Sequence, residues 1–407
     1  EPRRAALREL ADVLRAAIPW LDHAVRAARR SDGLYHAYNL ARFTEDGVEV
    51  DHLYPMLEGQ VAALSSGLLT PEEAADVLDA LYESPLYRED QRSFLLYPDR
   101  ELPGFLERNR VPEEAALAIP LLRGMLGAGD VRIVLRDADG RIRFRADFRS
   151  AAPLREALAA LRADPRWAEP AAADERAVLD LYESVFHHHA FTGRSGGMYG
   201  YEGLGCIYWH MVSKLLLAVG ENVERARRDG APPAVLARLV DRYFDVRSGL
   251  SAEKTPGEYG AFPTDPYSHT PGHAGAQQPG MTGQVKEEII ARLAELGATI
   301  EGGRLVFDAT LLRERELLRA PTRWAYIDVH GRERTLDLAP GELAFTLAQT
   351  PIVVRPGRGE NRIRVHAGGG VDTVAGSELD AGRSAAIFAR TGAVERLDVE
   401  LAAAPQR

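Results

Sequence analysis

The chain has 407 residues, with 60 Asp and Glu against 50 Lys and Arg and a formal net charge of −10 at pH 7. This balance argues against a nucleic-acid scaffold, which usually needs a concentrated basic face. The single cysteine, Cys206, excludes a disulfide within these residues. No apolar run approaches a membrane-spanning length and no signal peptide is visible, so we expect a soluble, cytoplasmic protein without a membrane partner. The sequence opens at Glu1-Pro2 without Met, which leaves open a missing N-terminal portion of the same polypeptide.

Residues 1–300 are dominated by apolar positions at helical spacing. Pro19 is expected to kink or split the first helix. Thr70-Pro71-Glu72-Glu73 predicts a firm helix start, because Thr caps the helix, Pro fits its first turn and carboxylates favour its N-terminal end. The last helix is expected from the helical spacing of Val285, Ile289, Ile290 and Leu293. The expected helices cover about 5–30, 55–67, 71–81, 112–124, 153–163, 173–186, 204–219, 233–244 and 284–296.

Two stretches alternate with period two and predict β-structure. Residues 131–148 read as a hairpin around an Asp-Gly turn, inserted between helices near 130–148. From Gly302 onward, short apolar runs separated by Gly, Asp and Pro predict a β-sandwich domain over 301–407. The fold class is therefore mainly α with a C-terminal β domain. Antiparallel helix pairs without sequence repeats over 1–300 suit a helical toroid, complete or incomplete. A solenoid is a possible alternative, but no repeat in the sequence supports it.

The stretch from Lys254 to Glu288 is rich in Gly and Pro, yet too aromatic for a solvated linker. An ordered loop of this length inside a domain is usually functional. Aromatic faces, amides and carboxylates suit a polyhydroxylated ligand, since its ring faces stack and its hydroxyls need donors and acceptors. The alternative is an inter-domain connector with incidental aromatics. The candidate substrate-binding and catalytic residues here are Glu258, Tyr259, Asp265, Tyr267, His269, Gln277 and Gln278.

A second Gly-rich loop contains Tyr199, Tyr201 and Glu202. It delivers Glu202 to the N-terminal end of a predicted helix, which favours the carboxylate form. We treat Tyr199 and Tyr201 as candidate substrate contacts and Glu202 as a candidate catalytic residue, the alternative being a plain helix-start residue. The nearby run 187–189 of three His is read as solvated rather than as a metal site, because no spaced Cys or acid accompanies it. His210 is read as a hydrogen-bonded core histidine.

Asp32 follows the first helix in a loop with Tyr35 and His36. If these rings desolvate its carboxyl, its pKa rises and it can serve as a general acid, with Tyr35 and His36 contacting substrate. The alternative is a turn residue before glycine. Thr282 and Gly283, at the entrance of the last helix, form a candidate phosphate-binding cradle, the alternative being an ordinary N-cap.

Taken together, these pieces resemble the C-terminal half of the cellobiose-phosphorylase-like group of inverting glycoside phosphorylases, within the (α/α)6-toroid glycosidases. The resemblance consists of scattered local matches between Asp32 and Leu312. It implies that Thr282 and Gly283 bind phosphate and that Asp32 is the proton donor, although the Trp-Asn-Asp signature of that group is replaced here by Asp32-Gly33-Leu34-Tyr35. The matching segments are Leu53–Gly67, Thr70–Glu73, Gly196–Tyr199, Pro266–Tyr267, Met281–Gly283 and Gly302–Leu305.

The leading hypothesis is a carbohydrate-active enzyme that cleaves or phosphorolyses a glycosidic bond with inversion. A phosphorylase needs one acid and a phosphate co-substrate, and no other cofactor or metal is expected. A hydrolase needs a second carboxylate roughly 6.5–9.5 Å from the acid, for which Glu202, Glu258 and Asp265 are candidates. The expected partner is an oligosaccharide or glycoside. The alternative is a non-catalytic carbohydrate-binding or scaffold segment of a larger enzyme.

Overall fold

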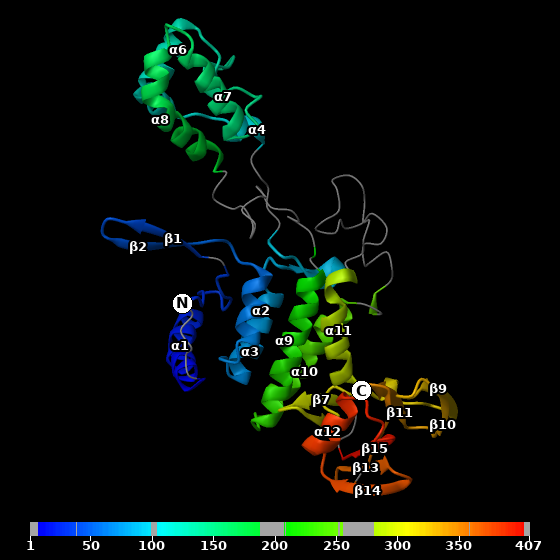
Figure 1. Cartoon of the computed structure of the whole chain (residues 1–407). Helices are drawn as coiled ribbons and strands as arrows, with labels where there is room; N and C mark the ends of the chain where they lie inside the picture. Colours follow the sequence, from blue (N-terminus) through cyan, green and yellow to red (C-terminus); the bar gives the residue numbers. More distant parts are fainter. Residues whose placement is uncertain are drawn as a thin grey trace. The chain divides into compact units, whose positions relative to one another are not determined.

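The computed structural model describes residues 7–37, 39–98, 104–187, 207, 209–250, 253–254, 281–357 and 359–402, without the side chains of 40 and 281–285. The chain divides into two compact units. Unit 1 comprises Glu1–Pro98 and Cys206–Arg407, and unit 2 comprises Asp99–Gly205. Figure 1 shows a mixed α/β chain in which the helices precede most of the strands.

The helical part of unit 1 is built around α9, which packs against α2, α10 and α11, while α10 also packs against α3. Figure 1 shows α9, α10 and α11 side by side. Polar contacts join the same pairs: Asn222 of α9 donates to the backbone oxygen of Leu64 in α2 at 3.0 Å, and Arg242 of α10 donates to Asp79 of α3 at 2.7 Å. The helices are α1 (Leu7–Ala27), α2 (Leu57–Ser65), α3 (Pro71–Tyr82), α9 (Trp209–Arg228), α10 (Pro233–Ser248) and α11 (Met281–Glu295).

The predicted start of α3 is confirmed in detail. The Thr70 side chain accepts from the Glu73 N–H at 3.2 Å, and the Glu73 carboxylate accepts from the Thr70 N–H at 2.9 Å. This capping box satisfies two backbone donors that a helix start would otherwise leave unpaired. By contrast, α1 continues through Pro19 as one helix and is not split there, while the alternative of a kink at Pro19 stays a prediction. None of the residues of α1 is buried.

Two small hairpins in unit 1 were not predicted from the sequence. The first pairs β1 (Asn39–Thr44) with β2 (Gly47–His52) in antiparallel register. The second pairs β3 (Tyr87–Arg88) with β4 (Ser93–Phe94) around the 3-10 helix η1 (Glu89–Gln91). In that turn Arg88 Nε donates to Asp90 at 2.9 Å. The apolar side chains Phe43, Val48 and Val50 of the β1–β2 hairpin are exposed rather than buried.

Unit 2 has its own core, formed by apolar side chains of helices and one hairpin. The hairpin predicted within 131–148 is confirmed: β5 (Val134–Arg136) pairs antiparallel with β6 (Ile142–Phe144). The turn is held by Asp137, whose carboxylate accepts from the N–H groups of Asp139 at 3.0 Å and Arg141 at 2.9 Å. The helices are α4 (Phe105–Arg108), α5 (Glu113–Ala118), α6 (Pro120–Ala128), α7 (Ala151–Arg162) and α8 (Ala168–Phe186).

The C-terminal residues form a five-stranded sheet in the order β11-β12-β15-β13-β14, in which β12 and β15 are parallel and the other neighbours antiparallel. Alternate side chains such as Ile352, Ile363 and Leu397 enter a core shared with β8 and α12. The elements are β7 (Ala298–Glu301), β8 (Arg304–Phe307), η3 (Glu314–Glu316), β9 (Thr322–Ile327), β10 (Glu333–Leu338), β11 (Leu343–Leu347), β12 (Thr350–Pro356), β13 (Arg362–Ala367), β14 (Gly370–Ala375), α12 (Ala381–Phe388) and β15 (Arg396–Leu401).

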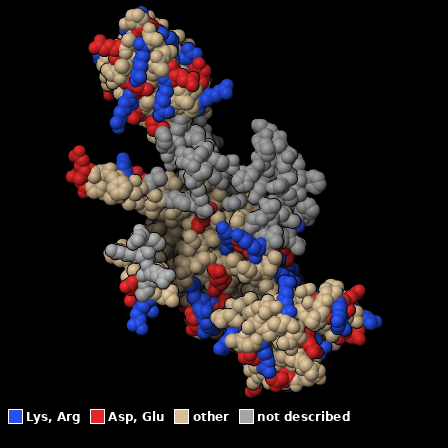
Figure 2. Space-filling view, viewed as in Figure 1, with Lys and Arg blue, Asp and Glu red and all other residues tan. Residues whose placement is uncertain are grey.

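The predicted mixture of helices and a C-terminal β region is thus present, but neither a toroid nor a sandwich is confirmed. In the described part of the C-terminal region, one sheet of five strands accompanies two-stranded hairpins. Across the visible face, acidic and basic side chains are interleaved over the described residues (Figure 2). Among the helices of the described ranges, none is both long and apolar enough to cross a membrane.

Candidate functional site

The loop after α1 holds Asp32 in an ion pair. Arg30 donates to the Asp32 carboxylate from Nε at 3.0 Å and from Nη2 at 2.9 Å, and the Leu34 N–H donates to it at 3.2 Å. The hydrogen bonds from Arg30 lower the pKa of Asp32, because they stabilise its charged form. The raised pKa expected from the sequence is therefore wrong. A carboxylate held ionised in this way is poorly suited to donate a proton.

Tyr35 and His36, the predicted neighbours of Asp32, have different surroundings. Tyr35 is buried, and burial raises the pKa of its phenol. Its backbone is fixed by Gln60 of α2, which accepts from the Tyr35 N–H at 2.8 Å and donates to the Tyr35 oxygen at 2.9 Å. The His36 ring stacks on His52 of β2 with centroids 3.8 Å apart, and burial lowers the pKa of His36. Tyr35 is thus a packing residue, and substrate contact by either residue stays a prediction.

A group of polar and aromatic side chains lies where α9 begins. We call it the helix-end cluster, and it consists of Gln91, Trp209, His210, Lys254 and Glu287. The Lys254 ammonium donates to the backbone oxygen of Gln91 at 2.8 Å and to its side-chain oxygen at 3.0 Å. It also lies 4.5 Å from the centre of the Trp209 ring, a cation–π contact. Next to Trp209, His210 Nε2 lies 3.1 Å from Glu287 Oε1.

The backbone segments that carry the helix-end cluster lie close to one another. Gly249, just after α10, lies so near η1 that a Cβ there would stand 2.1 Å from the Arg92 oxygen, so only glycine fits. Arg92 itself has a left-handed backbone with φ 50°, which turns the chain from η1 into β4. A β-bridge between Leu95 and Ile207 then sets the start of α9 beside the residues after β4.

The helix-end cluster differs from ordinary core packing because two of its side chains are charged and buried. Lys254 is 8% exposed and Glu287 is 5% exposed, while Trp209 is almost fully buried. Lys and Glu are almost never buried to this degree unless they are paired, because removing a charge from water is costly. Lys254, Gln91 and Trp209 form one contact group and His210 and Glu287 another, and the two are joined by the adjacent positions of Trp209 and His210 on α9. Charged, amide and aromatic groups of these kinds are usual in small-molecule sites. Among the described residues, this cluster is the best candidate for ligand binding.

Most of the predicted site residues lie outside the described part of the chain or at the start of α11. Thr282 and Gly283 occupy the first turn of α11, where unpaired backbone N–H groups point out of a helix. The following candidates lie outside the described residues: Tyr199, Tyr201, Glu202, Glu258, Tyr259, Asp265, Tyr267, His269, Gln277 and Gln278.

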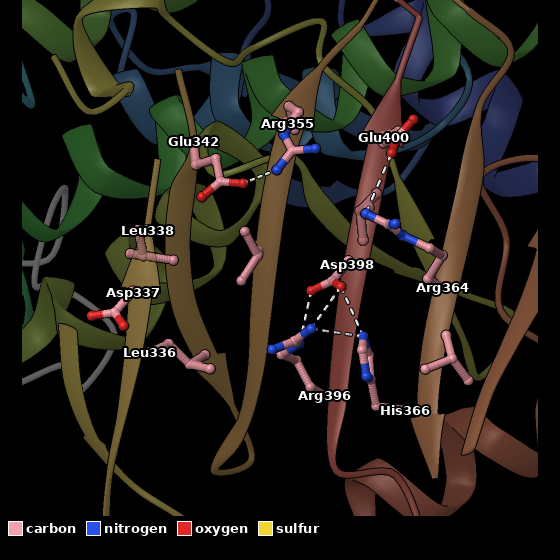
Figure 3. A pocket seen from close by; sticks show the side chains of 13 residues that line it. Leu336, Asp337, Leu338, Glu342, Arg355, Arg364, His366, Arg396, Asp398 and Glu400 are labelled. Atoms are coloured by element: carbon pink, nitrogen blue, oxygen red, sulfur yellow. Dashed lines mark hydrogen bonds and ion pairs between the residues drawn. The ribbon is translucent and has the colours of Figure 1, made fainter. Parts of the chain in front are cut away.

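A cavity of about 350 Å³ lies on the charged face of the C-terminal sheet. Figure 3 shows Arg364 directed toward Glu400 on the neighbouring strand β15, and Arg396 directed toward Asp398 on its own strand. Arg396 Nη2 donates to Asp398 at 3.0 Å, and His366 Nε2 lies 2.7 Å from the same carboxylate. Arg355 pairs with Glu342 in the same way. Because these charges neutralise one another within the sheet, we interpret the cavity as part of a structural ion-pair network.

Sequence reasoning missed most of the helix-end cluster. It interpreted His210 as a hydrogen-bonded core histidine, which agrees with its contact to Glu287. It left Gln91, Lys254 and Glu287 unassigned. One signal was present: Glu287, Ala291 and Glu295 are spaced by four residues and share one face of α11, and all three are buried. Within the described residues, no group of three or more His, Cys, Asp or Glu side chains could hold a metal ion.

Comparison with known proteins gives a family match for part of the chain. Residues 102–189 match the family model for GH149 phosphorylase insertion domain 2. The matched segment falls inside unit 2, which folds around its own core. Part of this chain is thus similar to an insertion domain of carbohydrate-active phosphorylases. No curated protein matches the chain.

Proposed function

We propose that the protein is a glycoside phosphorylase, which transfers a glycosyl group from a glycosidic bond to inorganic phosphate with inversion. The observation that carries this proposal is the agreement between the phosphorylase insertion-domain match at 102–189 and an independently compact unit at Asp99–Gly205. An insertion domain implies a host domain on either side of it, and unit 1 is formed by the segments that flank unit 2.

The chemistry required is modest. Phosphate oxygen bonds to the anomeric carbon while the bond to the leaving oxygen breaks, and a carboxylic acid protonates that oxygen. The products are a sugar 1-phosphate and a shortened glycoside. The first turn of α11, with Thr282 and Gly283, suits the phosphate because helix N-terminal N–H groups bind anions. Lys254 adds a buried positive charge in unit 1.

The identity of the proton donor stays a prediction. Asp32 was the choice from the sequence, and its ion pair with Arg30 opposes that role. Asp265 and Glu202 remain candidates outside the described residues. Each is tested by replacement with Asn or Gln, because the true acid should lose about 100-fold or more in turnover while substrate binding is retained.

The decisive experiment is product analysis of the purified protein with a panel of oligosaccharides, with and without inorganic phosphate. We expect sugar 1-phosphate to form only when phosphate is present. Reducing sugar released at the same rate without phosphate would show a hydrolase instead. Binding of an oligosaccharide by calorimetry without turnover in either condition would favour the non-catalytic carbohydrate-binding alternative.

A further inference from the structure

Helix α11 carries two buried carboxylates about two turns apart. Glu287 is 5% exposed and Glu295 is 2% exposed. They are the same residue type on the same helix, and both lie within unit 1. Their hydrogen-bond partners differ: both oxygens of Glu295 are paired within the described part of the protein, whereas one oxygen of Glu287 is not.

Glu295 has a partner for each oxygen. Its Oε1 accepts from the Tyr243 hydroxyl at 2.9 Å and lies 2.9 Å from Arg247 Nε. Its Oε2 accepts from Arg292 Nη1 at 2.9 Å. Two guanidinium groups and a phenol compensate the cost of burying this charge. Glu295 therefore joins α10 to α11, and both of its oxygens are paired within the protein.

Only one of the two carboxylate oxygens of Glu287 has a hydrogen-bond partner among the described residues. Its Oε1 lies 3.1 Å from His210 Nε2, and the exposed Lys286 ammonium is 3.8 Å from the same oxygen. Its Oε2 is buried and accepts no hydrogen bond within the described part of the chain. An unpaired buried acceptor costs about 1–3 kcal/mol, and more when it is charged. A fold retains such an oxygen most readily where a ligand supplies the missing donor.

The missing donor is best supplied by a neutral hydroxyl. A phosphate would place a second anion against the carboxylate, which is unfavourable at low dielectric. A metal ion would need more ligands, and the described residues hold no suitable group of three. Sugar hydroxyls are neutral donors of the right kind, and charged acceptors bind them more strongly than neutral ones.

The position of Glu287 also fits a sugar beside a phosphate. It follows Gly283 by four residues, which is about 6 Å along a helix axis. Side chains on a helix lean toward its N-terminus, so Glu287 leans toward the turn that holds Thr282 and Gly283. That turn is the candidate phosphate cradle. The open oxygen is thus placed for the glycosyl unit that the phosphate attacks.

We propose that Glu287 binds a hydroxyl of the transferred glycosyl unit through Oε2, and that His210 is a positioning residue that fixes the carboxylate through Oε1. The inference rests on the proposed phosphorylase function. It assigns Glu287 to substrate recognition and leaves proton donation to another carboxyl.

The test compares Glu287→Gln with the matched control Glu295→Gln, measuring KM for glycoside and for phosphate separately, together with Tm. Glu287→Gln should raise the glycoside KM about 10- to 100-fold, the usual loss for a hydrogen bond to a charged group. It should leave the phosphate KM and Tm nearly unchanged. Glu295→Gln should lower Tm and leave both KM values unchanged. His210→Ala should raise the glycoside KM partially, and His210→Gln, which keeps a donor near the position of Nε2, should restore it.

Deoxy substrates identify the hydroxyl. The deoxy-glycoside that lacks it should bind more weakly to the unsubstituted protein and show no further loss with Glu287→Gln, since the two changes remove the same bond.

An unchanged glycoside KM in Glu287→Gln, or a Tm loss equal to that of Glu295→Gln, would overturn the assignment while phosphorolysis stands. If phosphorolysis is absent, calorimetry with oligosaccharide and the same variants decides: weaker binding in Glu287→Gln alone supports the hydroxyl contact, and equal or absent binding rejects it.

Discussion

Replacing Gln60 with Leu tests how the loop carrying Asp32 is anchored. Gln60 is fully buried in α2, and its amide forms both backbone hydrogen bonds to Tyr35 at 2.8 and 2.9 Å. It also donates to the Met56 oxygen at 2.9 Å, but that oxygen keeps a second donor in the Gly59 N–H at 3.2 Å. Leucine has a similar size and no polar atoms. The change therefore leaves two buried backbone groups, the N–H and the oxygen of Tyr35, without partners.

Each buried unpaired group costs about 1–3 kcal/mol, so Gln60→Leu should lower the free energy of unfolding of unit 1 by roughly 2–6 kcal/mol. The loop can also detach from α2 so that water reaches both groups, which sets the lower end of this range. Denaturant unfolding measures the loss. Hydrogen exchange of the peptide covering residues 30–37 reports the loop directly, and its protection should fall.

The control is Leu64→Met on the same helix, a buried site without side-chain hydrogen bonds. This volume-conserving change should cost less than about 1.5 kcal/mol and leave loop exchange unaltered. A loss below about 1 kcal/mol for Gln60→Leu, with normal exchange at Tyr35, would refute the reasoning, because the two backbone groups would then have other partners.

Three further predictions concern single side chains. Thr70→Ala should destabilise unit 1 by about 1 kcal/mol in denaturant unfolding, because it removes one half of the capping box; no change would argue against the cap. In unit 2, hydrogen bonds from Arg132 lower the pKa of Asp130 from 3.8 to about 2, so Asp130 contributes stability that is present above pH 4 and is lost as the pH falls toward 2. Fluorescence of Trp167, which donates to Asp130 at 2.9 Å, should follow this transition, and Asp130→Asn should abolish its pH dependence. Asp32→Asn should leave turnover little changed, whereas a loss of about 100-fold or more would restore Asp32 as the proton donor.

Local signals in the sequence determined several elements outright. The start of α3 follows from Thr70, Pro71 and Glu73, because the hydrogen bonds of the capping box join residues only three apart in the chain. The β5–β6 hairpin follows from period-two alternation and from Asp137, which holds the turn. Such features need no distant partner, so they can be read from a short stretch of residues.

The buried face of α11 shows what local signals leave open. The helical spacing of Ile289 and Ile290 predicted the helix, but these two residues are 57% and 54% exposed. Glu287 and Glu295 are buried instead. Hydrophobic periodicity identifies the helix correctly, but which face is buried depends on what the neighbouring helices present to it.

The sequence alone thus determined where helices and hairpins begin and that the chain mixes a helical region with a C-terminal β region. Only the tertiary structure decided which charges lie inside. Glu295 can be buried because Tyr243 and Arg247 of α10 reach it, and Glu287 meets His210 because α9 packs against α11. These partners lie far away in the chain, and a carboxylate's environment is set by the groups that fold around it rather than by its neighbours in sequence.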